Sequence, residues 1–399
     1  MRASFGLVVL LSACSSSSAL PRIDGAPSPA TAVTVHTVLE GTDVSAIGVG
    51  DGAFVAGVGD HLVRSKLLGD DAISNVALRS TAGEPTTVGT TSLITARGLD
   101  GWLAVSDHGL FAGAGDGVAV SPFTTFVGQH HVRALDVAGD AANETLWIVA
   151  DDGAWVRRGT QVVPIAVGGS KIDAIAAIDD HRALVLSAGA LSEIDVASGV
   201  ANTVLDEAPA IAESSRGADG SLWLATDRGL VVRSPSGELT VRTFVASSDA
   251  PRAVRSVAAG IDRVVALVGP DVVTIVDGAA QVLVSDRAAA SRVAVDGNGD
   301  VWVSSPKKIE RVALGKPSSF AVDVAPFMKK HCQSCHAGGA GGAPVRAFDD
   351  YDTARAAASE ISVRLRAAGR PVMPPPQTER LAPADVRVVL RWIAGGMPR

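Results

Sequence analysis

The sequence predicts a multidomain chain in which an all-β propeller of seven blades precedes a small all-α domain. A short apolar strand, a polar turn and a second apolar strand recur between residues 40 and 310, where no helical period is found. The 399 residues exceed the roughly 100 to 200 expected of one domain. From Lys316 onward, 12 Lys and Arg oppose 7 Asp and Glu, a net charge of +5, whereas the preceding part carries −12. The last fifth is therefore expected to be a separate domain.

The repeat is clearest in residues 219–230 and 146–154, where a Gly or Asp turn separates two apolar strands. Each copy has an apolar anchor and a second apolar residue seven positions later. The average spacing is about 41 residues, the length of one four-stranded blade. The pattern resembles the Gly-Leu-Trp-type propellers of extracytoplasmic sensor and lipoprotein domains. The seven pairs are Val55/Leu62, Leu103/Leu110, Trp147/Ala154, Leu184/Leu191, Trp223/Leu230, Val265/Val272 and Trp302/Ile309.

We expect four segments: a signal peptide at 1–13, a flexible tether at 14–31, the propeller at 32–315 and the all-α domain at 320–399. The last propeller repeat ends near Leu314 without a fourth strand, and residues 31–40 form an unassigned strand. We expect this strand to pair with the final blade and close the ring, which would remove free sheet edges.

The N-terminus has the layout of a secretory signal: one charge at Arg2, an apolar run from Phe5 to Leu11, then small residues. The sequence Leu11-Ser12-Ala13-Cys14 resembles the lipobox of bacterial lipoproteins, which implies that Cys14 becomes the lipidated first residue. The alternative is ordinary cleavage near Ala19, with Cys14 discarded. The apolar run is shorter than the ~20 residues that span a bilayer, so a transmembrane helix is not expected.

The composition excludes several classes of protein. Hydrophobic residues make up 47% and charged residues 19%, which indicates a globular chain and not a disordered one. A net charge of −7 gives no overall basic surface for phosphate, so nucleic-acid binding is not expected.

Two of the three cysteines lie in Cys332-Gln333-Ser334-Cys335-His336, the attachment signature of a c-type haem. Thiols three positions apart on one helical turn can each add to a vinyl group of haem, and the adjacent imidazole can ligate the iron. A structural zinc site would need four ligands, and only His331 lies nearby. A thioredoxin-like dithiol would need a βαβ pattern beside the pair, which is absent from the sequence. One covalent haem c is therefore the expected cofactor.

From about Phe320, the sequence resembles a class I cytochrome c domain. The resemblance implies a first helix at 324–330 that carries the thiols, an amphipathic helix from a capping Asp352 to Gly369, and a last helix at 383–394. Trp392 would be the aromatic anchor where the terminal helices cross.

The resemblance also implies a methionine as second iron ligand, in a loop after the amphipathic helix. Met373 has this place, 37 residues beyond His336 and within a proline-rich segment that restricts the loop. Met397 and His331 are alternative ligands, and Met328 lies on the thiol-bearing helix. A polyproline segment that merely contains Met373 is the structural alternative.

Two further motifs in the propeller do not predict function. Residues 296–300 begin like a calcium loop, but Val301 and Lys307 stand where its Gly and Glu belong, so we expect a hairpin turn. No catalytic role is assigned to the six histidines of this region.

The sequence thus predicts an exported lipoprotein, periplasmic or at the cell surface, that carries single electrons and has no substrate turnover of its own. Its expected partners are a membrane, through the lipid anchor, and a redox protein, with acidic proteins as candidates. Two alternatives stay open: a quinoprotein-like propeller dehydrogenase coupled to the haem, and a redox-sensing scaffold that binds a partner protein.

Overall fold

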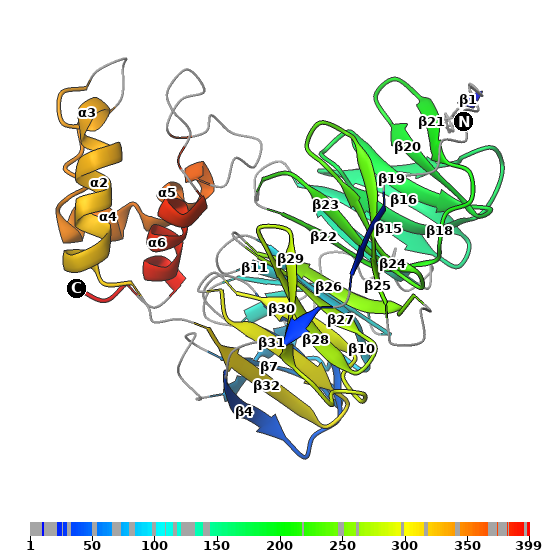
Figure 1. The fold of residues 1–399 in the computed structure, drawn as a ribbon, viewed down its shortest axis with the longest axis horizontal. Helices are drawn as coiled ribbons and strands as arrows, with labels where there is room; N and C mark the ends of the chain where they lie inside the picture. Colours follow the sequence, from blue (N-terminus) through cyan, green and yellow to red (C-terminus); the bar gives the residue numbers. More distant parts are fainter. Residues whose placement is uncertain are drawn as a thin grey trace.

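The structure is a computed structural model, and it describes residues 10–11, 22–25, 27–29, 33–49, 54–65, 73–79, 84–97, 101–107, 109–114, 118–120, 132–138, 144–217, 219–245, 251–260, 263–296, 299–314, 318–339, 344–365, 373, 381, 383–394 and 397–399. The described strands form seven sheets, which we number as blades 1 to 7 in chain order. Figure 1 shows the sheets grouped on one side and a helical unit on the other. The prediction of a seven-bladed all-β propeller is confirmed.

Each blade is a sheet of consecutive antiparallel strands, except that blade 7 takes its fourth strand from the N-terminal part of the chain. Blade 1 contains β5 Val44–Val49, β6 Phe54–Val58, β7 His61–Ser65 and β8 Ile73–Asn75. Blade 2 contains β10 Thr91–Arg97, β11 Gly101–Ser106, β12 Gly109–Ala114 and β13 Val118–Val120, to which β9 Ala77–Arg79 is added. Blade 3 contains β14 Val132–Ala138, β15 Thr145–Ala150, β16 Gly153–Arg158 and β17 Gln161–Ile165. Blade 4 contains β18 Ile172–Ala177, β19 Arg182–Ser187, β20 Ala190–Asp195 and β21 Val200–Leu205. Blade 5 contains β22 Ile211–Arg216, β23 Leu222–Thr226, β24 Gly229–Arg233 and β25 Leu239–Phe244. Blade 6 contains β26 Val254–Ala259, β27 Val264–Val268, β28 Asp271–Val276 and β29 Ala279–Val284. Blade 7 contains β30 Arg292–Val295, β31 Val301–Ser305, β32 Lys308–Ala313 and β4 Thr34–Glu40.

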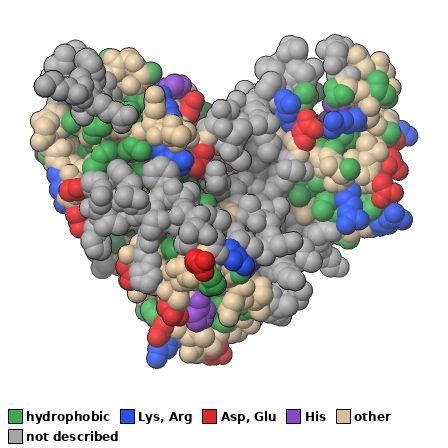
Figure 2. Space-filling model, turned by 180° about the vertical axis from the view of Figure 1, so that it is seen from behind, with side chains coloured by type: hydrophobic (Ala, Val, Ile, Leu, Met, Phe, Trp, Pro, Cys, Tyr) green, Lys and Arg blue, Asp and Glu red, His purple; other side chains and the backbone are tan. Residues whose placement is uncertain are grey.

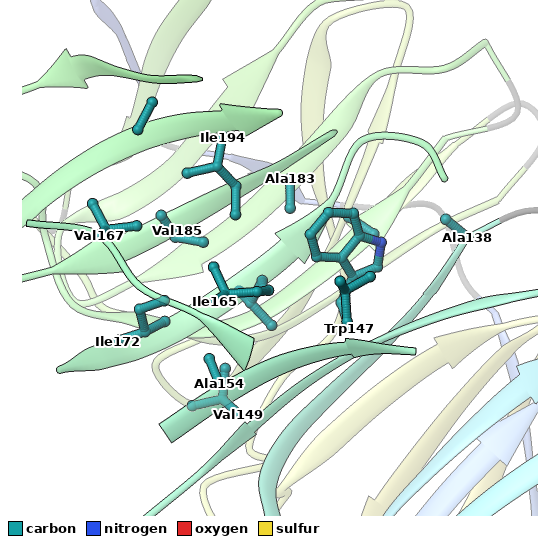
Figure 3. Packing of buried hydrophobic residues seen from close by; sticks show 14 residues of the cluster. Ala138, Trp147, Val149, Ala154, Ile165, Val167, Ile172, Ala183, Val185 and Ile194 are labelled. Atoms are coloured by element: carbon teal, nitrogen blue, oxygen red, sulfur yellow. The ribbon is translucent and has the colours of Figure 1, made fainter. Parts of the chain in front are cut away.

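The repeat anchors lie on the second strand of each blade, and their partners seven residues later lie on the third. Thirteen of the fourteen side chains are buried, and Trp223 is half-buried. Between blades 3 and 4, Trp147 and Val149 pack with Val185 and Ile194 of the neighbouring sheet (Figure 3). The apolar period found in the sequence therefore corresponds to the layers of core between successive blades.

Blade 7 closes the ring through β4, which pairs antiparallel with β32 from Thr34 against Ala313 to Glu40 against Lys308. The hypothesis that the strand within residues 31–40 closes the propeller is confirmed. This pairing gives blade 7 its fourth strand, and β4 leads directly into β5 of blade 1, so the first and last blades are joined. Closure of this kind links the two ends of the propeller and leaves no gap in the ring between blades 7 and 1.

Three short strands lie in the ranges for which the sequence predicts a signal and a tether. These are β1 Leu10–Leu11, β2 Arg22–Gly25 and β3 Ser28–Pro29, which extend blades 4, 5 and 6 as outermost parallel strands. The outer strands of a propeller have unpaired edges, so an extended segment passing beside them can pair with them.

The first strands of neighbouring blades contact one another around the whole ring, from β5 to β30 and back to β5. Side-chain oxygens from one blade cover the edge N–H groups of the next. Ser215 Oγ accepts the N–H of Ala259 at 2.9 Å, and Ser256 Oγ accepts the N–H of Val293 at 3.0 Å. These contacts satisfy backbone donors that the sheets themselves leave unpaired.

Two carboxylates link three consecutive blades each. Asp136 of blade 3 accepts the N–H of Ala177 in blade 4 at 2.8 Å and the hydroxyl of Ser214 in blade 5 at 3.5 Å. Glu213 of blade 5 accepts the N–H of Val257 in blade 6 at 3.2 Å and pairs with Arg292 of blade 7 at 2.8 Å. The centre of the propeller is therefore held by polar contacts, whereas the layers between blades are apolar.

Strands β30 and β31 pair antiparallel up to Val295 against Val301, so Asp296 and Asp300 flank the connection of a hairpin, as the sequence predicts. The carboxylate of Asp296 accepts the N–H of Asp300 at 3.0 Å and the indole N–H of Trp302 at 2.8 Å. Both aspartates are buried. The acidic side chains of this segment thus bind the anchor tryptophan and the backbone.

The C-terminal helical unit contains η1 Phe320–Val324, α2 Ala325–His331, α3 Gln333–His336, α4 Tyr351–Ala356, α5 Ala358–Leu365 and α6 Pro383–Ala394. Its core includes Phe320, Met328 and Trp392, and the indole of Trp392 packs on Phe320 with ring centroids 5.4 Å apart. Figure 2 shows this unit as a lobe on which acidic and basic side chains are interspersed.

The assignment of residues 320–399 to the class I cytochrome c family is wrong. The described helices of this segment are short, from 4 to 12 residues, and do not show the all-α cytochrome domain that the resemblance implied. The helix expected to run without interruption towards Gly369 is divided at Ala357, whose φ of −95° and ψ of 3° leave the helical region. The described residues also hold no group of three or more His, Cys, Asp and Glu side chains that could bind a metal ion.

The cap of α4 also differs from the prediction. Asp350, and not Asp352, is the N-cap, and its carboxylate accepts the N–H of Thr353 at 2.9 Å. Asp352 lies in the first turn, 3.6 Å from Arg399. Both aspartates suit the start of a helix, and the hydrogen bond to the third helical N–H selects Asp350 as the cap.

Among the described residues, no helix combines the length and the apolar character that crossing a bilayer requires.

Candidate functional site

A cavity of about 170 Å³ lies within the helical unit. Its apolar wall is formed by side chains of α2, α5 and the segment before α4, and His336 of α3 also lines it. The shape follows from the sequence of α2 and α5, because their apolar residues repeat at three- and four-residue steps and face inward. The apolar lining residues are Phe327, Met328, Phe348, Ile361 and Leu365.

Three of the four residues predicted to hold the haem line this one cavity: Cys332, His336 and Met373. Cys332 ends α2, and its N–H donates to the carbonyl of Met328 at 2.9 Å. Met373 approaches α5, since its N–H donates to the carbonyl of Arg364 at 3.1 Å. Folding thus brings a methionine 37 residues away in sequence to the same cavity as the thiol and the imidazole.

Cys335 lies on α3 and is not among the residues that line the cavity. Its N–H donates to the carbonyl of Cys332 at 3.3 Å, so both thiols belong to one helical turn. Both thiols are free and half-buried. The predicted lipidation residue, Cys14, lies outside the described residues.

The imidazole of His336 is held in a defined orientation. Its Nδ1 lies 2.9 Å from the carbonyl oxygen of Pro344, and the ring meets Phe348 edge-on at 4.8 Å. A carbonyl oxygen can only accept, so Nδ1 carries the proton and donates it. Nε2 of the neutral ring is therefore the nitrogen with a free lone pair, which suits it to bind a metal.

Burial raises the pKa of the Cys332 thiol to about 11, with a further contribution from the charge of Cys335. Cys332 is therefore protonated at neutral pH, and its sulfur lies 3.6 Å from the sulfur of Met328. Redox-active dithiols depend on a lowered thiol pKa. This environment does not suit the dithiol alternative considered from the sequence.

The alternative iron ligands make contacts elsewhere. His331 lies 3.9 Å from the carboxylate of Asp385, and its ring packs at a tilt against Phe327, with centroids 4.9 Å apart. The side chain of Met397 packs on the core of the helical unit, and its N–H donates to the carbonyl of Trp392. Neither residue lines the cavity, whereas Met328 does so from the thiol-bearing helix.

One group that sequence reasoning missed is the carbonyl of Pro344, which orients His336. Another is a charged cluster on the cavity wall, formed by Arg346, Glu360 and Arg364. Its members lie up to 18 positions apart in sequence and carry no motif. A helical spacing of four between Glu360 and Arg364 is the single sequence signal that could have indicated part of it.

No protein-family model matches the chain, and no curated protein matches it. Several solved structures share its fold. Streptogramin B lyase is 12% identical with a TM-score of 0.52, over 71% of this chain and 98% of that one. Virginiamycin B lyase from Staphylococcus aureus is 13% identical with a TM-score of 0.53, over 71% of this chain and 100% of that one.

A third similar structure is the extracellular domain of a one component system from B. thetaiotaomicron. It is 14% identical with a TM-score of 0.51, over 72% of this chain and 41% of that one. At such identities the likeness establishes the fold alone. The class that the fold defines is a β-propeller protein, to which this chain adds a helical unit with an apolar cavity.

Proposed function

We propose that the protein is an exported electron carrier, in which one covalent haem c bound to the helical unit passes single electrons and the propeller serves as a docking scaffold. The observation that carries the proposal is the cavity, because Cys332, His336 and Met373 line it together. In the proposed arrangement, Cys332 and Cys335 form the thioethers, and His336 and Met373 ligate the iron.

The residues present fit a haem by their chemistry. A porphyrin supplies four nitrogens to its iron, so the protein needs to add only two ligands and no cluster of acidic or thiolate groups. A neutral imidazole nitrogen and a thioether sulfur are such ligands. The apolar side chains that line the cavity suit the faces of a macrocycle.

The bound haem would supply a reversible exchange of one electron between ferrous and ferric iron. The residues of the chain would set how easily this exchange occurs. The hydrogen bond from His336 Nδ1 to Pro344 fixes the ring and increases the electron density at Nε2. Apolar side chains such as Phe348 and Ile361 exclude water and disfavour the more highly charged ferric state.

The N-terminal pattern supports export and a lipid anchor at Cys14, which would place the protein in the periplasm or at the cell surface. One of the structures that share the fold is an extracellular domain, which agrees with a propeller working outside the cytoplasm. The partner in this proposal is a redox protein, and the net charge of +5 on the C-terminal segment favours an acidic one.

Absorption spectroscopy of protein matured in the periplasm tests the ligand set. Ligation by methionine gives a sulfur-to-iron charge-transfer band, and we expect Met373→Ala alone to abolish it. Met397→Ala and His331→Ala serve as controls and should keep the band. Loss of the band in either control, or its persistence in Met373→Ala, would overturn the assignment of Met373. A quinone absorbance in addition to haem would favour the dehydrogenase instead.

A further inference from the structure

The cavity wall contains a charged cluster beside the residues assigned to the haem. Arg346 and Glu360 form an ion pair at 2.9 Å, which joins the segment before α4 to α5. Arg364, one turn beyond Glu360, lies 3.7 Å from the second oxygen of the same carboxylate. All three side chains line the cavity, where the other lining side chains are apolar or are the proposed haem-binding residues.

Two guanidinium groups lie beside a single carboxylate here, so these three side chains together carry one net positive charge. Arg346 is fixed close to the haem-binding helix, because its N–H donates to the carbonyl of His336 at 3.1 Å. Arginine is the cation best suited to carboxylates, since its planar fork can donate two parallel hydrogen bonds.

We infer that Arg346 and Arg364 form a carboxylate-binding pair that takes the two propionate groups of the haem, with Glu360 holding both side chains in place. This inference rests on the proposed function, because the propionates belong to the proposed cofactor. Two anionic groups on one edge of an otherwise apolar molecule match two cations on one side of an otherwise apolar cavity. Electrostatically, the pair would also raise the reduction potential, since positive charge destabilises the ferric state.

The test uses the full exported chain with Arg346→Gln, Arg364→Gln and Glu360→Gln, and with Arg355→Gln as the matched control. Arg355 is an exposed arginine on α4 that does not line the cavity. Three quantities are measured: covalent haem content, the reduction potential, and the propionate bending band in the resonance Raman spectrum. The Lys variants of Arg346 and Arg364 keep the charge and carry the test if a Gln variant does not fold.

We expect Arg346→Gln and Arg364→Gln to keep the haem, lower the potential and shift the propionate band. Glu360→Gln should raise the potential, and Arg355→Gln should change neither quantity. The Lys variants should keep the parent potential while the band still shifts, because lysine cannot donate the paired hydrogen bonds of arginine.

An unchanged propionate band in both Gln variants would overturn the inference and leave the proposed function standing, whether or not the potential moves. The inference is likewise overturned, and the proposed function stands, if Arg355→Gln shifts the reduction potential as much as Arg346→Gln and Arg364→Gln do. A parent protein that carries no haem would overturn the inference and the proposed function together.

Discussion

At the scale of single residues, the propeller depends on a few buried polar groups that tie strands to their neighbours. Asp136 shows this most directly, since burial raises its pKa while the nearby charge of Arg216 and the N–H donors of Ala177 and Val137 oppose the shift. The carboxylate of Asp136 satisfies backbone donors of its own blade and of the next, even though burial makes its ionisation costly.

The raised pKa of Asp136 makes a signed prediction about pH. The folded protein holds this proton more tightly than the unfolded chain, whose carboxyl has the ordinary pKa of 3.8. The stabilisation from the bound proton is therefore complete below that value and is lost as pH rises through the raised pKa. Asp136→Asn cannot ionise, so its stability relative to the parent should increase from acid to neutral pH.

Urea unfolding at several pH values measures this difference. Asp350→Asn is a suitable control, because hydrogen bonds from Thr353 lower the pKa of Asp350 and its stabilising effect is instead lost as pH falls. A relative stability of Asp136→Asn that stays constant with pH, or that decreases as pH rises, would contradict the account.

Trp302 provides a second prediction at this scale. Its buried indole donates to Asp296 at 2.8 Å and packs on Phe54. Trp302→Phe removes one donor from a buried carboxylate, so we expect the free energy of unfolding to fall by about 1–3 kcal/mol. Trp223→Phe is the comparison, because that indole is half-buried and donates to the hydroxyl of Ser221. Equal losses in the two variants would argue against a special role for Asp296.

At the scale of elements, one strand distant in sequence completes the fold. β4 pairs with β32 along its length, and Val38 and Leu39 pack on the core between blades 7 and 1. The sequence signal was indirect, because it consisted of a last repeat without a fourth strand and a first segment without a blade. Closure was predicted from the general rule that a propeller joins its first and last blades and leaves only short, protected edges.

Deletion of residues 31–40 should therefore lower the thermal unfolding temperature of the propeller and broaden its transition, since blade 7 loses its fourth strand and the core between blades 7 and 1 loses Val38 and Leu39. A milder variant, Leu39→Ser, removes apolar contact and keeps the backbone pairing, so it should have a smaller effect in the same direction. Thr37→Ser changes an exposed residue of the same strand and serves as the control. Unchanged thermal stability after the deletion would refute closure by β4.

Sequence periodicity predicted the blades well and the polar contacts poorly. The pair Trp147 and Ala154 was predictable because adjacent strands repeat a local pattern. Asp136 and Ser214 lie 78 positions apart in the sequence, and their contact joins blades 3 and 5. No local sequence pattern distinguishes either residue. In the helical unit, Cys332, Cys335 and His336 were predicted as haem-binding residues from a motif, and Met373 from the family resemblance. Arg346 and the carbonyl of Pro344 could not be predicted, because only the folded structure brings them to the cavity and to His336.

At the scale of the whole molecule, the charge is divided between the two parts. The segment from Lys316 carries +5 and the preceding part −12, so an anionic reactant should approach the helical unit faster than a cationic one. For the haem proposed in the helical unit, we expect oxidation by ferricyanide to slow as salt is raised, because the screening length falls from about 10 Å at 0.1 M to about 3 Å at 1 M. Oxidation by hexaammineruthenium(III) should show the opposite slope, and the absence of a slope for both reagents would contradict local electrostatic steering.

The proposed function requires a haem joined to the chain at Cys332 and Cys335, and intact-mass analysis of the exported protein detects such a bond. We expect the mass of the processed chain plus one haem under denaturing conditions, and a Cys332→Ala/Cys335→Ala variant without this addition. A colourless parent protein whose mass shows only the chain, with the two thiols free or joined in a disulfide, would contradict it.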